Sequence, residues 1–334
     1  MPVHLPEATV LDRVGQVLRA HGVDSFTAAA VASSIVAAER DGTYSHGLAR
    51  LPGFLSSLDS GWVNGAPSMT VSEPAPAVVR IDAGNGFAQG ALARGRELAM
   101  HKARECGLCA ISIHNSHHFG SLWPDVEPFA QAGLVALAFV HSRARIVAPG
   151  ANRPVLGTNP MAFALPRKGH LPVVWDQASS VIAHGDVILA AEKGHTLPPG
   201  AGVDRHGQAT CDPHAVLDQG ALTPFAGHKG FLIALLVEAL AAAMTGSRFG
   251  FEDTSARVPG AVTSNAGQFL LLIDPQRAGA DDFSARIEQL LEALVSSGST
   301  RLPGDRRHAN RVRALEQGIA MDDAMHRLLL QASA

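Results

Sequence analysis

Few cysteines, no basic run and no long apolar segment mark this sequence, and each absence excludes a class of protein. Only three of its 334 residues are cysteine, and the formal net charge is −3. The N-terminus lacks the cationic and apolar regions of a signal peptide. The most apolar stretch, 231–244, is shorter than the roughly 20 residues that span a bilayer. No basic run is present, so we expect no nucleic-acid partner. Since signal-peptide and membrane-spanning patterns are also missing, we expect a cytoplasmic protein with no membrane partner.

The cysteines and histidines do not follow a metal-binding pattern. Cys106 and Cys109 form a C-x-x-C pair, but the second pair that a zinc site needs is missing. Gly107 between them is typical of a helix end, and 108–113 is typical of a buried strand, so we interpret both cysteines as structural. The 16 histidines include no H-E-x-x-H motif. The sequence therefore predicts no metal site.

Hydrophobic periodicity predicts a mixture of helices and strands. With 46% hydrophobic residues, the chain is long enough for one large domain or two closely packed domains. The expected helices are one around 10–18, one capped by Ser25 or Thr27, 88–106, one that starts at Pro124, 229–245 and 283–295. The expected strands are 78–82, 108–113, 134–140 and 269–273. Residues 61–76, 149–172 and 301–307 are predicted to be linkers or loops, and a final amphipathic helix is expected after 307.

A glycine-rich segment between an expected strand and an expected helix resembles a dinucleotide fingerprint but does not match it. Gly84, Gly86 and Gly90 give G-x-G-x-x-x-G instead of G-x-G-x-x-G, and no acidic residue follows at the end of the next strand. We reject a Rossmann interpretation. These glycines are expected to form a tight turn.

The segment 41–50 brings three chemical groups within six residues. Ser45, His46 and Arg50 supply a hydroxyl, an imidazole and a guanidinium just after an amphipathic helix. This is a proton donor with an orienting partner and an anchor for a carboxylate, as the reduction of a C=O or C=N beside a carboxylate requires. Taken alone, a polar helix exit explains the segment equally well.

Other polar clusters follow expected strands or begin expected helices. His117 and His118 end a strand, where functional side chains gather, and backbone N–H groups at the next helix start suit an anion. Asp186 is a candidate for the carboxylate that orients His46, with a solvated turn as the alternative. Lys229 opposes the helix dipole unless an anion is present. Thr158 offers a hydroxyl in an Asn-Pro turn, and three arginines within 301–307 resemble a clamp for an anion.

Together these blocks resemble the type-2 malate/L-lactate dehydrogenase family of NAD(P)-dependent oxidoreductases. The resemblance rests on D-G-x-x-S-H-G-x-x-R, N-S-x-H-F-G, G-T-N-P, the helix that begins Lys229-Gly230, and R-L-P-G. It implies a mixed α/β fold with a largely antiparallel cofactor-binding sheet, not a Rossmann fold, and a homodimer. It also implies that residues 1–60 pack with 302–334 as a helical part, and that 61–301 form a central sheet domain.

Within the family, the chain is most similar to reductases of Δ1-pyrroline-2-carboxylate and Δ1-piperideine-2-carboxylate, whose products are L-proline and L-pipecolate. His117-His118 followed by Leu122-Trp123-Pro124, the A-H-G-D block at 183–186 and the P-F-A-G-H-K-G block at 224–230 carry this similarity. The resemblance implies a relay of Ser45, His46 and Asp186, with His46 as proton donor. An imidazole with a pKa near neutral pH suits that role.

The resemblance also assigns binding roles. The implied substrate residues are Arg50, Thr158, His184 and Gly185. The implied cofactor residues are His118, Phe119, Gly120, Ser121, Leu122, Asp176, Gln177, Ala178, Lys229, Arg301, Leu302, Pro303, Gly304, Asp305, Arg306 and Arg307. Since the three arginines could meet a 2′-phosphate, NADPH is expected over NADH.

Three alternatives stay open. A 2-oxoacid reductase of the malate, lactate, ureidoglycolate or sulfolactate type uses the same anchor and donor, and in some such enzymes the acid corresponds to His118. A catalytically silent nucleotide-binding protein is opposed by the intact Ser45, His46, Arg50 and Asp186. A metal-dependent lyase is opposed by the absence of a carboxylate-rich motif.

Overall fold

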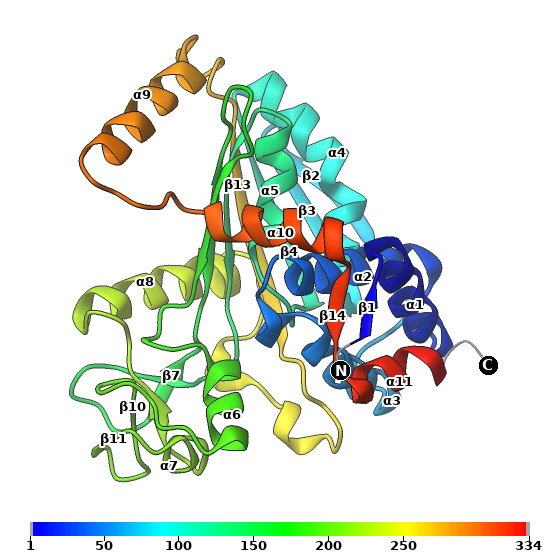
Figure 1. Cartoon of the computed structure of the whole chain (residues 1–334), viewed down its shortest axis with the longest axis vertical. Coiled ribbons are helices and arrows are strands. Elements are labelled where there is room, and N and C mark those ends of the chain that lie inside the picture. Colours follow the sequence, from blue (N-terminus) through cyan, green and yellow to red (C-terminus); the bar gives the residue numbers. More distant parts are fainter. Residues whose placement is uncertain (1–2, 332–334) are drawn as a thin grey trace.

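A seven-stranded sheet runs through the middle of the molecule in the computed structural model, which describes residues 3–331 (Figure 1). Only the β3–β4 pair is parallel, and the other five pairs are antiparallel. The mixed α/β fold with a largely antiparallel sheet is therefore confirmed. The strands in sheet order are β2 (Thr70–Ala75), β3 (Val78–Phe87), β4 (Leu108–His117), β13 (Asn265–Ile273), β5 (Val135–Val140), β8 (Met161–Leu165) and β9 (Val173–Gln177).

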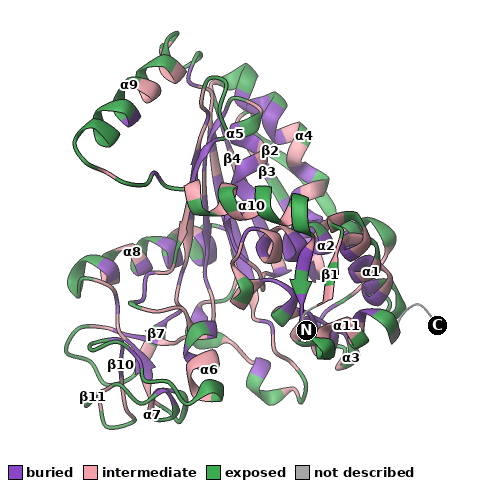
Figure 2. Ribbon diagram, viewed as in Figure 1, coloured by how far each residue is buried: buried purple, intermediate pink, exposed green. Residues whose placement is uncertain are grey.

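Helices cover both faces of this sheet. Because successive strand residues point to opposite faces, Leu270 and Leu272 pack into the cluster that contains α4 (Ala88–Cys106) and α5 (Trp123–Gln131), whereas Phe269 packs on the other side. That second face is covered by α8 (His228–Glu238) and the π-helical turn Ala239–Ala243, through Val237 and Ala241. Figure 2 shows the resulting buried layer along the strands.

The two ends of the chain form a helical layer beside the sheet. Apolar residues of α1 and α2, among them Val10 and Val31, share one core with Ile319 and Leu329 near the C-terminus. The layer consists of β1 (Val3–Leu5), α1 (Glu7–Ala20), α2 (Ser25–Arg40), α3 (Leu51–Asp59), α10 (Asp305–Gln317), β14 (Ile319–Met321) and α11 (Asp323–Gln331). The limits 1–60, 61–301 and 302–334 stay predictions, and residues 1–2 and 332–334 lie outside the described residues.

A small lobe at one end of the large sheet is built on a second sheet of very short strands. Ile146, Val187 and Leu222 belong to its separate apolar core. In sheet order the strands are β11 (Ala209–Thr210), β10 (Gly202–Val203), β12 (Ala221–Leu222), β6 (Ile146–Val147) and β7 (Pro154–Leu156), with α6 (His184–Lys193) and α7 (Pro213–Leu217) beside them. The helix α9 (Phe283–Ser296) lies at the opposite end of the molecule (Figure 1) and is held by Leu291 and by an Arg167–Glu288 ion pair.

The structure corrects several sequence-based predictions. Asp24 caps α2, because its carboxylate accepts hydrogen bonds from the N–H groups of Phe26 and Thr27, so neither Ser25 nor Thr27 is the cap. Gly84 and Gly86 lie inside β3 and not in a turn before α4. The register with β4 shifts between Asp82 and Gly86, so the glycines form a bulge, and Gly84 has a φ of +59°.

All three segments predicted as linkers or loops contain regular structure. Residues 61–76 include β2, the edge strand of the large sheet. Residues 149–172 include β7 and β8, and residues 305–307 form the first turn of α10. The helix predicted over 229–245 starts at His228 and changes to π-helical geometry at Ala239. Within residues 3–331, no helix is both long enough and apolar enough to cross a bilayer.

Candidate active site

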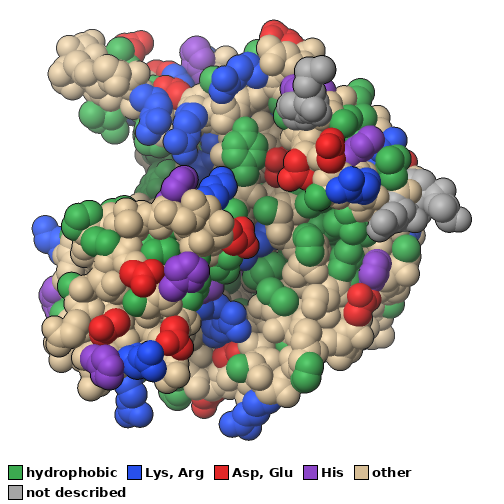
Figure 3. Space-filling model, turned by 60° about the horizontal axis from the view of Figure 1, so that its bottom comes forward, with side chains coloured by type: hydrophobic (Ala, Val, Ile, Leu, Met, Phe, Trp, Pro, Cys, Tyr) green, Lys and Arg blue, Asp and Glu red, His purple; other side chains and the backbone are tan. Residues whose placement is uncertain are grey.

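A cavity of about 470 Å³ lies where the helical layer, one end of the large sheet and the small lobe meet. Figure 3 shows a hollow between the small lobe and the rest of the molecule, with basic side chains in and beside it. Many of the sequence-predicted site residues line the cavity. They are Ser45, His46, Arg50, Gly120, Ser121, Leu122, Thr158, Asp176, Gln177, Ala178, His184, Gly185, Asp186, Arg306 and Arg307.

The loop 41–50 is held in place by contacts with α10. The buried carboxylate of Asp41 accepts hydrogen bonds from Arg311 of α10. Gly42 has a φ of +82°, and a Cβ there would lie 2.1 Å from Nδ2 of Asn310, so only glycine fits. These contacts anchor the loop to α10, and two short 3₁₀ turns, Tyr44–His46 and Leu48–Arg50, then present the reactive side chains.

Ser45, His46 and Arg50 form a hydrogen-bonded row. Oγ of Ser45 lies 3.0 Å from Nδ1 of His46, and Nη2 of Arg50 lies 3.4 Å from Nε2 of His46. A guanidinium only donates, so Nε2 of His46 accepts and the ring proton sits on Nδ1. Burial, Arg50 and His118 lower the pKa of His46 to about 3. Burial and these two neighbours favour the neutral form of His46, against the expected pKa near neutral pH.

Arg50 is a half-buried cation, and no carboxylate within residues 3–331 hydrogen-bonds it. Its guanidinium lies 4.5 Å from the ring centre of Phe119, and its Nε has no hydrogen-bond partner. A Cβ at Gly185 would lie 2.7 Å from Nη2, so the glycine gives the guanidinium its space. Burial lowers the pKa of Arg50 to about 10, although the charge of Asp186 opposes the shift. Such a cation is prepared for an anionic ligand.

Asp186 lines the cavity in the first turn of α6, but it does not complete the predicted relay in this arrangement. Among the described residues, no hydrogen bond joins Asp186 to Ser45 or His46. The charge of Asp186 acts on Arg50, whose pKa it raises. The role of Asp186 in a relay stays a prediction.

Sequence analysis missed Arg145, which contacts a residue of the cavity wall. Nη1 of Arg145 hydrogen-bonds Nε2 of His184. Burial, Arg143 and Arg50 lower the pKa of Arg145 to about 9. The available signal was the position of Arg145 just after the buried strand β5, because strand ends and the loops after them carry functional groups.

The two adjacent histidines at the end of β4 are both buried. The ring of His117 lies 3.0 Å from Oδ1 of Asn85 and 3.0 Å from Oγ1 of Thr263, so its interpretation as functional is wrong and it is part of the core. Nε2 of His118 lies 3.0 Å from Oδ2 of Asp125, and its side chain does not line the cavity. Of the two candidate acids, His46 lines the cavity and His118 does not.

Most of the predicted cofactor residues line one or both of two neighbouring hollows. Asp176 accepts from the N–H groups of Leu122 and Trp123, so the helix start that suited an anion is occupied by a carboxylate, whose pKa burial raises. A second hollow of about 500 Å³ shares Asp176, Gln177, Arg306 and Arg307 with the first. Its further lining includes Arg301, Leu302, Pro303 and Gly304.

Four predicted cofactor residues line neither hollow: His118, Phe119, Lys229 and Asp305. Phe119 packs under Arg50, and the carboxylate of Asp305 accepts a hydrogen bond from the N–H of Leu302, just before α10. Lys229 lies exposed at the start of α8, away from the other cofactor residues. Within residues 3–331, no three His, Cys, Asp or Glu side chains are arranged to hold a metal ion.

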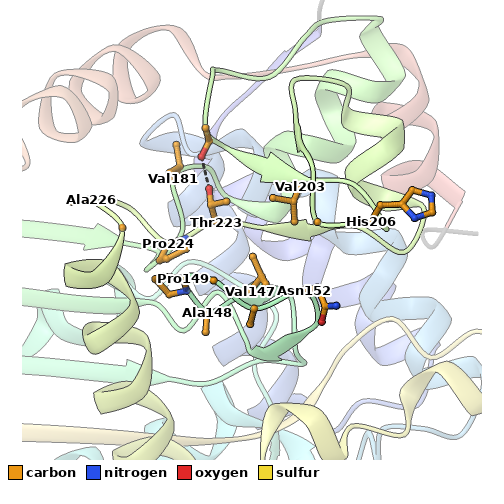
Figure 4. A pocket seen from close by; sticks show the side chains of 15 residues that line it. Val147, Ala148, Pro149, Asn152, Val181, Val203, His206, Thr223, Pro224 and Ala226 are labelled. Atoms are coloured by element: carbon orange, nitrogen blue, oxygen red, sulfur yellow. Dashed lines mark hydrogen bonds between the residues drawn. The ribbon is translucent and has the colours of Figure 1, made fainter.

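The small lobe carries a separate hollow of about 750 Å³ (Figure 4). Its lining is mainly Val, Ala, Pro and Gly, with Asn152 and Thr223 as uncharged polar residues and His206 as the titratable group. It contains no Asp, Glu, Lys or Arg. This hollow therefore lacks the cationic and proton-donating groups of the cavity around Arg50.

The comparisons agree with this geometry. A family model described as malate/L-lactate dehydrogenase matches residues 5–330. The chain is 48% identical over 315 residues to the Delta(1)-pyrroline-2-carboxylate/Delta(1)-piperideine-2-carboxylate reductase of Pseudomonas syringae pv. tomato, covering 94% of this chain and 92% of that protein. It is 42% identical over 294 residues to the (2R)-3-sulfolactate dehydrogenase (NADP(+)) of Chromohalobacter salexigens, covering 88% and 87%.

A solved structure extends the similarity to three dimensions. The crystal structure of delta1-piperideine-2-carboxylate reductase from Pseudomonas syringae matches with a TM-score of 0.97 and 46% identity, and the match covers 99% of both chains. Family model, sequence and fold therefore agree over nearly the whole chain. The protein belongs to the malate/L-lactate dehydrogenase family.

Proposed function

We propose that this protein reduces cyclic ketimines that carry a carboxylate on the imine carbon. The substrates are Δ1-pyrroline-2-carboxylate and Δ1-piperideine-2-carboxylate, and the products are L-proline and L-pipecolate. Near full-length relatives that are named as reductases of these two substrates support the proposal. The observation that carries it in the structure is the contact between Arg50 and His46 in a buried cavity, which sets an anion anchor beside a proton-bearing ring.

Arg50 binds the substrate carboxylate. Its guanidinium offers several N–H donors in a planar fork that matches a carboxylate, and its Nε is buried without a partner. Thr158, His184 and Gly185 line the same cavity and complete the substrate site. A small planar ring whose carboxylate reaches Arg50 then has its C=N group near His46.

His46 supplies the proton. A protonated C=N is the better hydride acceptor, so the reaction takes one proton onto nitrogen and one hydride onto C2. The neutral ring gains its proton more easily once a carboxylate has neutralised Arg50, because Arg50 is one of the causes that lower its pKa. Ser45 orients the ring through Nδ1, and Asp186 supports the charged form after substrate binding.

The two connected hollows suit a nicotinamide cofactor. Oγ of Ser121 is buried without a partner, and Arg306 and Arg307 line both hollows, which suits a ligand with polar groups and phosphates. The cofactor supplies the hydride, and the chain supplies binding and orientation. We assign NADPH, because Arg301, Arg306 and Arg307 offer charge for a 2′-phosphate. The cytoplasmic location stays a prediction.

A homodimer is part of the proposal. The helix α8 has Leu232, Leu235 and Leu236 each close to half exposed, and Met244 follows with 57% exposure. A contiguous apolar face on one helix is unusual for a monomer. Lys229 is the second residue of the same helix, so a second subunit on this face would lie next to it.

The proposal is tested by a substrate panel. NADPH and NADH are each offered pyrroline-2-carboxylate, piperideine-2-carboxylate, pyruvate and oxaloacetate, and cofactor oxidation is followed. We expect faster turnover of the imines, with NADPH. His46→Ala should lower kcat by about a hundredfold or more while NADPH binding persists. His101→Ala, at an exposed histidine of α4, is the matched control.

A 2-oxoacid reductase is the second candidate, because a sulfolactate dehydrogenase is 42% identical. Faster reduction of the oxoacids in the panel would favour it. The buried contact of His118 with Asp125 argues against the version of this mechanism in which His118 is the acid.

A further inference from the structure

A hydrogen bond between Arg145 and His184 supports one wall of the proposed substrate site. Nη1 of Arg145 contacts Nε2 of His184. His184 lines the cavity beside Gly185 and Asp186, whereas Arg145 does not line it. Arg145 therefore reaches a bound substrate only through the imidazole.

The backbone of Arg145 is held from two sides. Its N–H donates to the carbonyl of Leu156 at 2.8 Å, and its carbonyl accepts from the N–H of Leu222 at 2.8 Å. Leu156 lies on β7 and Leu222 on β12, so the small sheet sets the position of Arg145. His184 is the first residue of α6, and the side-chain contact therefore connects this sheet to that helix.

The chemistry of the two groups decides where the proton on His184 lies. A guanidinium has only donors, so Nε2 of His184 accepts and carries no proton. The proton of the neutral ring is then on Nδ1, which has no hydrogen-bond partner in the described part of the chain. Nδ1–H is thus available to a ligand.

The surroundings of His184 disfavour a second proton. Burial and the charges of Arg145, Arg143 and Arg50 lower the pKa of His184 to about 2. Elements packed against α6 bring three further titratable groups, Tyr44 and His46 from the first 3₁₀ turn and His214 from α7. Asp186 is the acid in the first turn of α6 itself.

Resting on the ketimine reduction proposed above, we infer that Arg145 is a positioning residue that holds His184 as the neutral Nδ1–H tautomer. The ring then donates a hydrogen bond to the substrate carboxylate without adding a positive charge. This matters because the imine nitrogen must be protonated to accept hydride, and another cation nearby opposes that protonation. Arg50 supplies the charge that binds the carboxylate, and the hydrogen bond from His184 orients that carboxylate.

The test compares two arginines that differ in one contact. Arg145→Met removes the guanidinium that holds His184. Arg143→Met removes an equal charge from a neighbour whose Nη1 lies 3.4 Å from Oγ of Ser255 and does not contact the imidazole. Arg145→Lys keeps a charge and a donor. For each, KM and kcat with pyrroline-2-carboxylate and NADPH are measured between about pH 5.5 and 8. The Kd of pyrrole-2-carboxylate, a planar analogue that cannot be reduced, is measured on the NADP⁺-loaded enzyme.

We expect Arg145→Met to raise KM and Kd about tenfold at pH 8, with partial recovery in Arg145→Lys. In Arg145→Met at pH values under about 6.5, His184 can take a second proton. The ratio of the variant's KM to the wild-type KM should therefore decrease there, and kcat should decrease as well. This ratio cancels the titration of the substrate itself. Arg143→Met should stay within about threefold of wild type, with a flat ratio.

Equal changes in both methionine variants, or a flat ratio in Arg145→Met, would overturn the inference. The affinity for NADPH is expected to stay unchanged and shows whether each variant is folded. If Arg145→Met does not fold, Arg145→Lys takes its place in the comparison. If the wild-type protein does not reduce the imine, the proposed function fails, but the Kd measurements still show whether Arg145 acts through His184. If the wild type is active and Kd is insensitive to Arg145, only this inference fails.

Discussion

Two clusters of buried charge lie at the two ends of the loop 41–50, and they are paired differently. At the start, Asp41 accepts hydrogen bonds from Arg40 and Arg311, and Arg311 also binds Glu127. We call these four residues the structural cluster. At the end, Arg50 contacts His46, and Arg145 contacts His184. These four form the pocket cluster, in which neither arginine hydrogen-bonds a carboxylate of the described residues.

The pKa values of the arginines show the consequence. Burial alone would lower the pKa of Arg311, but its hydrogen bonds to Asp41 and Glu127 raise it above the ordinary value. In the pocket cluster, burial dominates and the pKa falls to about 10 for Arg50 and about 9 for Arg145. A buried pair that is complete stabilises the fold, whereas a buried cation without an acid is satisfied by a bound anion.

Breaking the pocket cluster should cost activity and leave stability nearly intact. Arg50→Met removes the carboxylate anchor, so we expect kcat/KM for the imine to fall about a thousandfold, mainly through KM. The melting temperature should not fall, because a buried charge without an acid is removed. Steady-state kinetics and thermal unfolding check this pair of outcomes, and an unchanged KM would remove the anchor role.

Breaking the structural cluster should do the reverse. Arg311→Met leaves the carboxylates of Asp41 and Glu127 buried without their cation, which should cost about 3 kcal/mol of unfolding free energy. Arg313→Met, at an exposed position of the same helix, is the control and should change it by less than about 0.5 kcal/mol. Urea denaturation measures both, and equal losses would contradict the comparison.

A bound anion should make the pocket cluster resemble the structural one. Binding of pyrrole-2-carboxylate to Arg50 supplies the missing carboxylate, so the pKa of His46 should rise from about 3 toward its ordinary value. NMR titration of the His46 ring with and without the ligand measures this. An unchanged His46 pKa would show that Arg50 is not where the carboxylate binds.

The smallest expected effect concerns Glu39, which lies under the same loop. Its carboxylate accepts from the N–H of Leu48 at 2.8 Å, and burial raises its pKa from 4.5 to about 7. A carboxyl whose pKa is raised by folding binds more protons in the folded state, so its contribution to stability falls as pH rises from about 4.5 to 7. Glu39→Gln should therefore stabilise the protein by about 2 kcal/mol at pH 8 and not at pH 4. Unfolding at the two pH values checks the sign, and a destabilisation at pH 8 would refute it.

Sequence patterns predicted the long elements well because these depend on local periodicity. The helix 88–106 was predicted with its observed bounds, and strands over 108–113, 134–140 and 269–273 are present in slightly different lengths. The short strands of the small lobe were not predicted. Strands of two or three residues carry no periodic signal, and they exist only because distant segments pair with them.

The residues of the candidate site also differ in whether the sequence could predict their roles. Ser45, His46 and Arg50 are close in sequence, and their chemistry could be recognised there. Arg145 could not, because its importance depends on His184, which is 39 residues away and reaches it only through the folding of the small lobe. His117 was misjudged for the opposite reason, since its partners Asn85 and Thr263 fill the core around it.

The sequence by itself determined the family resemblance, which implied a largely antiparallel sheet, and the reactive groups of the loop 41–50. Those properties reside in residue types and short spacings. The tertiary structure decided which charges are paired and which remain available. Burial and the distance between groups that are far apart in the chain set the pKa values of Arg50, Arg145, His46 and His184, and neither can be read from composition or spacing.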